Sequence, residues 1–141
     1  MKKITLAILL IVSVGICKAQ VTLPKTDNIS AAKDFIKPPA IGDANKTTDG
    51  IVNDLTSKLS LPVGQKSPLT GAINGFLTKK KDITGLADSN PTDYLSKFGG
   101  LQKGLFGKMK GIMGASAFTK FLGMKPSGAT IAGNPLSHLF F

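Results

Sequence analysis

The sequence predicts an all-α fold, in which four or five short helices pack as a small bundle. Apolar residues recur at helical spacing in separate segments, and no segment keeps the alternation typical of a β-strand. The pairs Ser67-Pro68 and Asn90-Pro91 are typical of helix starts, because proline fits the first helical turn. We expect a flexible segment before the helices and an irregular tail after them.

Residues 1–19 are expected to be a cleavable signal peptide. Two lysines precede an apolar run over residues 4–16, and Cys17-Lys18-Ala19 places small residues at the positions that a signal peptidase reads. The run is shorter than the ~20 apolar residues that span a bilayer, which disfavours a membrane anchor. Bulky Ile16 before the cysteine disfavours lipid attachment. We therefore expect export to the periplasm, the outer envelope or the medium.

Residues 20–47 are predicted to form a flexible segment with one short helix, Ala31 to Ile36, capped by Ser30. A helical domain is expected over residues 48–125. Its first helix should run from about Thr48 to Leu59, with Thr48 or Asp49 as the N-cap. The apolar face of that helix consists of Ile51, Val52, Leu55 and Leu59.

The next helix is expected to begin at Ser67, with Pro68 in the first turn. Its buried stripe should consist of Leu69, Ala72, Ile73, Phe76 and Leu77. Residues 79–81 are three consecutive lysines at the negative end of the helix dipole, and we interpret them as stabilising that helix end rather than forming a binding patch.

The last part of the domain, residues 95–125, is a glycine-rich amphipathic stretch. A helix from about Pro91 to Phe98, capped by Ser89 or Asn90, should lead into it, and a further helix should run from Ser116 to Met124. Residues 126–141 form a tail with several prolines and glycines. We expect four apolar residues to dock this tail on the core: Leu136, Leu139, Phe140 and Phe141.

Five glycines in the amphipathic stretch follow a spacing of 4, 3, 4 and 3, which places them on one narrow helical face: Gly100, Gly104, Gly107, Gly111 and Gly114. The opposite face is apolar: Leu95, Phe98, Leu101, Leu105, Phe106, Met109, Ile112 and Met113. Three interpretations remain open. In the first, the segment is a flexible or partly helical stretch whose apolar face packs on the core and whose glycine face meets water. In the second, the glycines pack against another helix, such as one carrying Gly71 and Gly75, or against a second copy. In the third, the segment is a cationic amphipathic helix that binds membranes.

The composition excludes several kinds of chemistry. Every positive side chain is lysine and every acid is aspartate, so the paired hydrogen bonds of arginine to bases and phosphates are absent and specific nucleic-acid recognition is not expected. The only cysteine, Cys17, lies in the predicted signal, so we expect no disulfide. His138 is the only histidine and no catalytic or metal-ligating set accompanies it. We predict no cofactor, no metal site and no enzymatic activity.

The positive charge is concentrated in the C-terminal third. Residues 20–93 contain nine lysines and eight aspartates, whereas residues 94–141 contain six lysines and no acid. These lysines either form a solvated face that aids solubility or attract an anionic surface. The signal, the proline-capped short helices and the glycine-punctuated stretch together resemble small uncharacterised exported helical proteins of bacteria. That resemblance implies an exported helical protein and assigns no activity and no site.

The preferred hypothesis is a non-enzymatic envelope or secreted protein that binds an anionic membrane surface or a protein partner. Its expected contact surface combines apolar and lysine residues: Phe98, Leu101, Lys103, Leu105, Phe106, Lys108, Met109, Lys110, Ile112 and Met113. Two alternatives are a self-assembling module packed through the five glycines and a membrane-active, toxin-like cationic protein, because residues 104–114 resemble cationic glycine-rich membrane-active peptides.

Overall fold

A computed structural model describes residues 35–141, and within that range the fold is all-α, as the sequence predicts. Five α-helices and one short 3₁₀ helix follow one another: α2 (Ala44–Leu59), α3 (Val63–Ile83), α4 (Leu86–Ser89), α5 (Pro91–Gly123), η1 (Gly128–Thr130) and α6 (Ser137–Phe140). The predicted signal peptide and most of the predicted helix over residues 31–36 lie outside the described residues. Phe35 and Ile36 have no helical structure, so that helix does not reach its expected end.

Helix α2 begins four residues earlier than the sequence predicts. Asp43 Oδ1 accepts hydrogen bonds from the main-chain nitrogens of Asn45 and Lys46, at 2.8 and 3.0 Å, which makes Asp43 the N-cap. The prediction of a cap at Thr48 or Asp49 is therefore wrong. The Thr48 hydroxyl donates instead to the Ala44 carbonyl, inside the helix and buried. The helix ends as predicted at Leu59.

Helix α3 also starts early, at Val63, so the predictions of a cap at Ser67 and of Pro68 in the first turn are wrong. Pro68 lies inside the helix and cannot donate to the carbonyl of Gly64, one turn earlier. Because Gly64 is exposed, water satisfies that carbonyl at little cost. The expected apolar stripe is confirmed: Leu69, Ile73, Phe76 and Leu77 are buried, and Ala72 is partly buried.

Helix α5 joins segments that the sequence predicted separately. Asn90 caps it, because its side-chain oxygen accepts from the Asp93 nitrogen at 3.2 Å, and Pro91 follows at the first position, as expected. The helix bends at Gly114, whose φ of 80° and ψ of 165° lie outside the helical region. The bend falls close to the predicted boundary between the glycine-rich stretch and the final helix.

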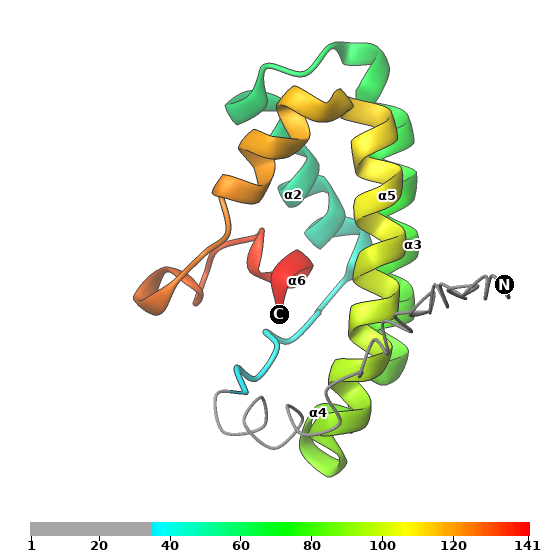
Figure 1. Cartoon of the computed structure of the whole chain (residues 1–141), viewed down its shortest axis with the longest axis vertical. Coiled ribbons are helices and arrows are strands. Elements are labelled where there is room, and N and C mark those ends of the chain that lie inside the picture. The colour runs from blue at the N-terminus through cyan, green and yellow to red at the C-terminus, as the bar shows by residue number, and fades with distance from the viewer. Residues whose placement is uncertain (1–34) are drawn as a thin grey trace, which may run out of the picture.

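Helices α3 and α5 lie side by side along the long axis of the molecule, and α5 turns away from α3 beyond its bend (Figure 1). Helix α2 packs against α3 and also contacts α5. The core between these helices consists of aliphatic side chains with aromatic residues toward both ends of α5: Tyr94, Phe98 and Phe121 are 1, 5 and 0% exposed. None of the helices over residues 35–141 is both long enough and apolar enough to cross a bilayer.

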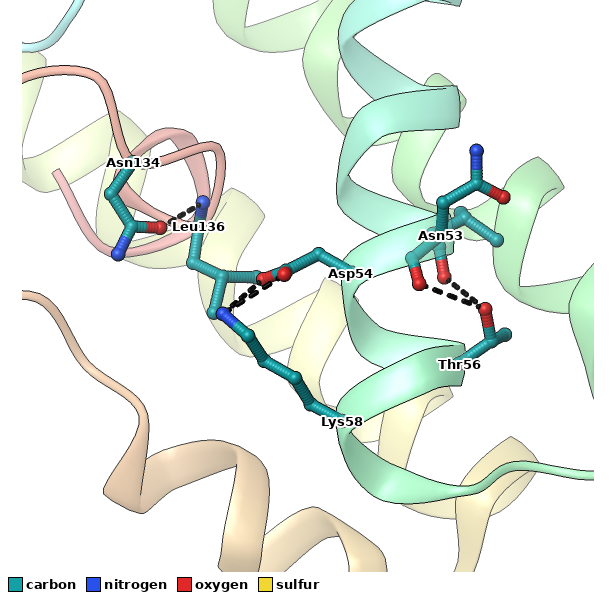
Figure 2. Close-up of polar contacts among 7 residues, drawn as sticks. Asn53, Asp54, Thr56, Lys58, Asn134 and Leu136 are labelled. Carbon is teal, nitrogen blue, oxygen red and sulfur yellow. Dashed lines mark hydrogen bonds and ion pairs between the residues drawn. The ribbon is translucent and has the colours of Figure 1, made fainter.

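The tail docks on the core, as predicted. Leu136 and Leu139 are 1 and 0% exposed, and Phe140 and Phe141 are partly buried. Asn134 Oδ1 accepts a hydrogen bond from the Leu136 nitrogen just before α6; Figure 2 shows this contact, together with the ion pair of Lys58 and Asp54 on α2. Gln102 of α5 donates to the Leu139 carbonyl at 2.8 Å. Helix α6 is therefore anchored to α5.

Candidate functional site: the exposed basic surface of α5

Helix α5 has an inner face that belongs to the core. Phe98, Leu105, Met109 and Met113 are between 0 and 6% exposed. Leu101, Phe106 and Ile112 are partly buried against them, and so is Leu95. The predicted apolar face is thus confirmed. Phe98, Leu105, Met109 and Met113 are buried inside the protein, so the prediction that they belong to a contact surface is wrong. A fold this small needs these side chains to form its core.

The outer face of α5 consists of the five glycines and of the lysines beside them. All five glycines are exposed, and a Cβ placed on any of them would find no atom within 4 Å beyond its own helical neighbourhood. Close packing of these glycines against Gly71 and Gly75 within the chain is therefore wrong. The first interpretation is confirmed in part: the apolar face packs on the core and the glycine face is exposed, but the stretch is helical except at Gly114 rather than flexible or partly helical.

Gly71 and Gly75 do face Gly100 and Gly104, across an open groove between α3 and α5 that is also lined by Phe76. Leu101 and Leu105 of α5 also line the groove. Lys79 and Lys108 border the groove. The groove is a shallow surface feature with a cationic rim.

On the other side of the glycines, the bend in α5 creates a concave apolar surface that we call the elbow surface. It consists of Gly99, Gln102, Lys103, Phe106, Gly107, Lys110, Phe118 and Leu122. Phe106 comes from the first part of α5, and Phe118 and Leu122 from the part beyond Gly114. Leu122 is 42% exposed, one of the few large apolar side chains in the described chain with that exposure.

An aromatic cluster holds the elbow surface in shape. The Phe106 ring lies edge-on to the rings of Phe118, Phe121 and Phe140, with centroids 5.5 to 5.9 Å apart. Phe121 stacks on Phe140 of α6 at 5.1 Å. These ring contacts connect the two parts of α5 with each other and with α6. The rings of Phe106 and Phe118 remain partly accessible on the concave side of the bend.

The electrostatics of this surface are uniformly positive. Lys103, Lys108 and Lys110 are exposed, and none of them pairs with an acid in the described part of the chain, where the ion pairs involve Lys37, Lys58 and Lys97. No acid follows Asp93 in the sequence. The elbow surface therefore combines apolar rings with unpaired ammonium groups, Lys103 and Lys110, at its edge.

Sequence reasoning missed the role of Lys80. This side chain is 0% exposed, and its Nζ donates to the main-chain oxygens of His138, at 2.7 Å, and Phe141. The Nζ also lies 5.0 Å from the centre of the Phe98 ring. Lys80 lies in the last turn of α3, where the sequence predicts a lysine that stabilises the helix end, and it also holds α6 against α3. Lys80 lies four residues after Phe76 and three after Leu77, so it continues the buried stripe of α3, and this spacing could have indicated its burial.

Burial sets the protonation of this cluster. Burial lowers the pKa of Lys80 to about 7, although the two main-chain oxygens that it contacts favour the protonated amine. Burial, with a further contribution from the charge of Lys80, lowers the pKa of His138 to about 4. The imidazole is therefore neutral at pH 7, and its Nδ1 atom is buried without a hydrogen-bond partner. His138 lines a pocket with Lys46, Thr47 and Asn134, but no aspartate joins them.

Comparison with protein-family models, with curated proteins and with solved structures gives no match for this chain. Within residues 35–141, no cluster of three or more histidine, cysteine or acidic side chains is arranged to hold a metal ion. The class of protein that the structure defines is a small all-α bundle with a basic, glycine-rich helix on its surface.

Proposed function

We propose that this chain is a non-enzymatic exported protein that attaches to an anionic membrane surface through the elbow surface and the neighbouring lysines of α5. One observation supports this most: accessible apolar rings lie directly beside unpaired lysines, in a third of the chain that contains no acid. Peripheral membrane binding needs both components, an apolar face that enters the interface and cations that attract anionic headgroups.

The buried inner face of α5 favours attachment over insertion. An amphipathic helix that penetrates a bilayer uses its apolar face for the lipid, but here that face contacts α3 and the core. On the concave side of the bend, the partly accessible rings and Leu122 remain available for the lipid interface. We therefore expect binding without membrane rupture, which separates this proposal from the toxin-like alternative.

Flotation of the full chain with vesicles tests the proposal. We expect the protein to float with vesicles rich in phosphatidylglycerol at low salt, and to remain behind with phosphatidylcholine vesicles or at high salt, since screening weakens attraction at the surface. Equal behaviour with both lipids would contradict the proposal. Release of a trapped dye from the same vesicles would instead favour the toxin-like alternative.

Two sets of variants assign the surface. Each lysine near an anionic bilayer contributes about 1 kcal/mol, so the double variant K103Q/K110Q should bind anionic vesicles roughly tenfold or more weakly. The matched control K46Q/K66Q removes the same charge from exposed positions on α2 and α3, and should bind almost as well as the unchanged protein. Leu122→Ser should weaken the binding that survives at high salt. Equal losses in both double variants would show that only net charge matters.

The α3/α5 groove favours a second candidate, self-assembly through the glycines. Four of them, Gly71, Gly75, Gly100 and Gly104, border one open groove, and small residues allow a helix of another copy to approach closely. The oligomeric mass in solution tests this idea. A monomeric mass for the unchanged protein, and the same mass after Gly104→Leu, would contradict it.

A further inference from the structure

A separate cavity of about 300 Å³ lies where the first described residues, the first turns of α5 and α6 meet. Its walls are almost entirely apolar: Phe35, Ile36, Leu95, Phe98, Phe140 and Phe141. Small-molecule sites in proteins are typically concave and apolar, with a few polar groups that set orientation. Of its lining residues only Phe98 belongs to the contact surface expected from the sequence.

One wall of the cavity contains Tyr94. Its ring stacks on Phe98, with centroids 5.6 Å apart and planes 10° apart, and the Phe35 ring lies edge-on at 5.9 Å. Burial raises the pKa of the Tyr94 phenol well above its ordinary value, so the side chain stays neutral. The sequence contains no other tyrosine and no tryptophan. Tyrosine fluorescence from this protein therefore reports on this cavity alone.

Lys125 is the only charged residue among those that line the cavity. It is exposed, and its Nζ lies 5.2 Å from the centre of the Phe141 ring. No acid in residues 35–141 forms an ion pair with it. The cavity thus places one ammonium group, which pairs with no side-chain acid of the described residues, beside apolar and aromatic walls.

We propose that this cavity binds the acyl chain of a single-chain anionic amphiphile, a medium-chain fatty acid, whose carboxylate pairs with Lys125. The apolar walls exclude a polar ligand such as a sugar or a free phosphate, because none of them supplies the hydrogen bonds that such a ligand would lose with water. The ammonium group selects a negative head over a neutral one. No side-chain acid of the described residues pairs with Lys125, so the ligand carboxylate supplies a partner for its ammonium group.

Titration of the full chain with decanoate below its micelle concentration, at pH 8, tests the proposal. We expect a saturable change in Tyr94 fluorescence with one decanoate bound per chain by calorimetry. Decanol has the same chain without the charge and should bind roughly tenfold more weakly, because a charge-assisted contact contributes more than a contact to a neutral group. A linear fluorescence response, or equal affinity for decanoate and decanol, would overturn the proposal.

Variants locate the contact. Lys125→Gln should reduce decanoate affinity to that of decanol and leave decanol binding unchanged. Lys120→Gln, on the same part of the chain but not in the cavity wall, should leave both unchanged. Leu95→Trp, with circular dichroism to check folding, should fill the cavity and abolish binding of both ligands. Equal effects of the two lysine variants would overturn the assignment to this cavity.

The vesicle experiment remains independent of this one. K103Q/K110Q should lose vesicle binding and retain decanoate binding, whereas Lys125→Gln should lose the carboxylate preference while the protein still floats with anionic vesicles. If decanoate binding also followed K103Q/K110Q, the elbow surface rather than this cavity would hold the ligand, and the proposal would be wrong.

Discussion

The inner and outer faces of α5 share one helix and one backbone, yet they differ in almost every physical respect. The inner face supplies Leu105, Met109 and Met113 to the core, and these are nearly inaccessible to water. The outer face presents glycines and unpaired lysines, and a Cβ added to its glycines would meet nothing. The inner face can therefore account for folding. On the outer face, the positive φ of Gly114 requires a glycine, but folding alone gives no reason for the other four.

The energetic difference between the faces is large. Each helical glycine costs about 0.5–1 kcal/mol relative to alanine. None of the four with helical geometry, Gly100, Gly104, Gly107 and Gly111, gains a close helix contact within the chain in return. The core residues must offset that cost. Stability therefore does not explain the glycines of the outer face. We propose that an interaction with a surface outside the chain explains them.

The largest expected effect comes from truncating the inner face. Met109→Ala should lower the free energy of unfolding by about 2–5 kcal/mol, because the side chain is fully buried and leaves a cavity. Lys110→Ala, the next residue on the exposed side, should change it by less than about 0.5 kcal/mol. Urea unfolding measures both. Similar losses would mean that α5 is not oriented as described.

Lys80 provides the second test, because it is a lysine on the buried side of its helix. Its pKa is lowered in the folded state from 10.5 to about 7, so between these values the unfolded chain binds more protons. The free energy of unfolding should therefore rise from pH 7 to pH 9 and, for this group, be level below pH 7.

Denaturant unfolding of Lys80→Met measures this contribution, with Lys81→Met as the control on the exposed side. We expect the rise to be lost in the first variant and kept in the second. Measurements should stay below pH 10, the ordinary pKa of tyrosine, so that Tyr94 does not contribute. An unchanged rise in Lys80→Met would show that its pKa is not lowered by burial.

Two glycines three residues apart give the third test. Gly111 has helical geometry and free space, so Gly111→Ala should stabilise the protein by about 0.5–1 kcal/mol. Gly114 has a φ of 80°, which side chains rarely adopt, so Gly114→Ala should destabilise it by about 1–3 kcal/mol. Thermal unfolding measures both changes. Effects of the same sign would contradict the bend at Gly114.

The smallest expected effect concerns a polar atom on the inner face. The Tyr94 hydroxyl is buried without a hydrogen-bond partner. Tyr94→Phe should therefore leave the free energy of unfolding unchanged or raise it by up to about 1 kcal/mol. A clear loss of stability would show that the hydroxyl makes a contact that the described structure lacks.

Much of this fold could be predicted from periodicity. The buried stripe of α3 and the inner face of α5 follow directly from apolar spacing, and Asn90-Pro91 marked a true helix start. The predicted starts of α2 and α3 are wrong. The N-cap Asp43 lies five residues before Thr48, the first of the two predicted caps, and α3 runs through Pro68, which the sequence places in the first turn.

The candidate site could be predicted only in part. Lys103 and Lys110 are exposed, as a contact surface requires, but four of the predicted apolar contact residues lie in the core. The spacing of apolar residues does not show whether a helix face packs on the protein's own core or is available to a partner. Phe118 and Leu122 were missed for a different reason. They join the elbow surface only because α5 bends at Gly114, and the predicted boundary between two helical segments does not give the angle at which they meet.

The central claim is that the outer face of α5 is free in the folded protein and meets the membrane. An environment-sensitive dye on Gly107→Cys, in a Cys17→Ser background, tests it directly, with Asn53→Cys on exposed α2 as the control. We predict a blue shift for the dye at position 107 on addition of anionic vesicles, and none at position 53 or with neutral vesicles. Equal spectra at both positions, under conditions where the protein floats with the vesicles, would contradict the claim.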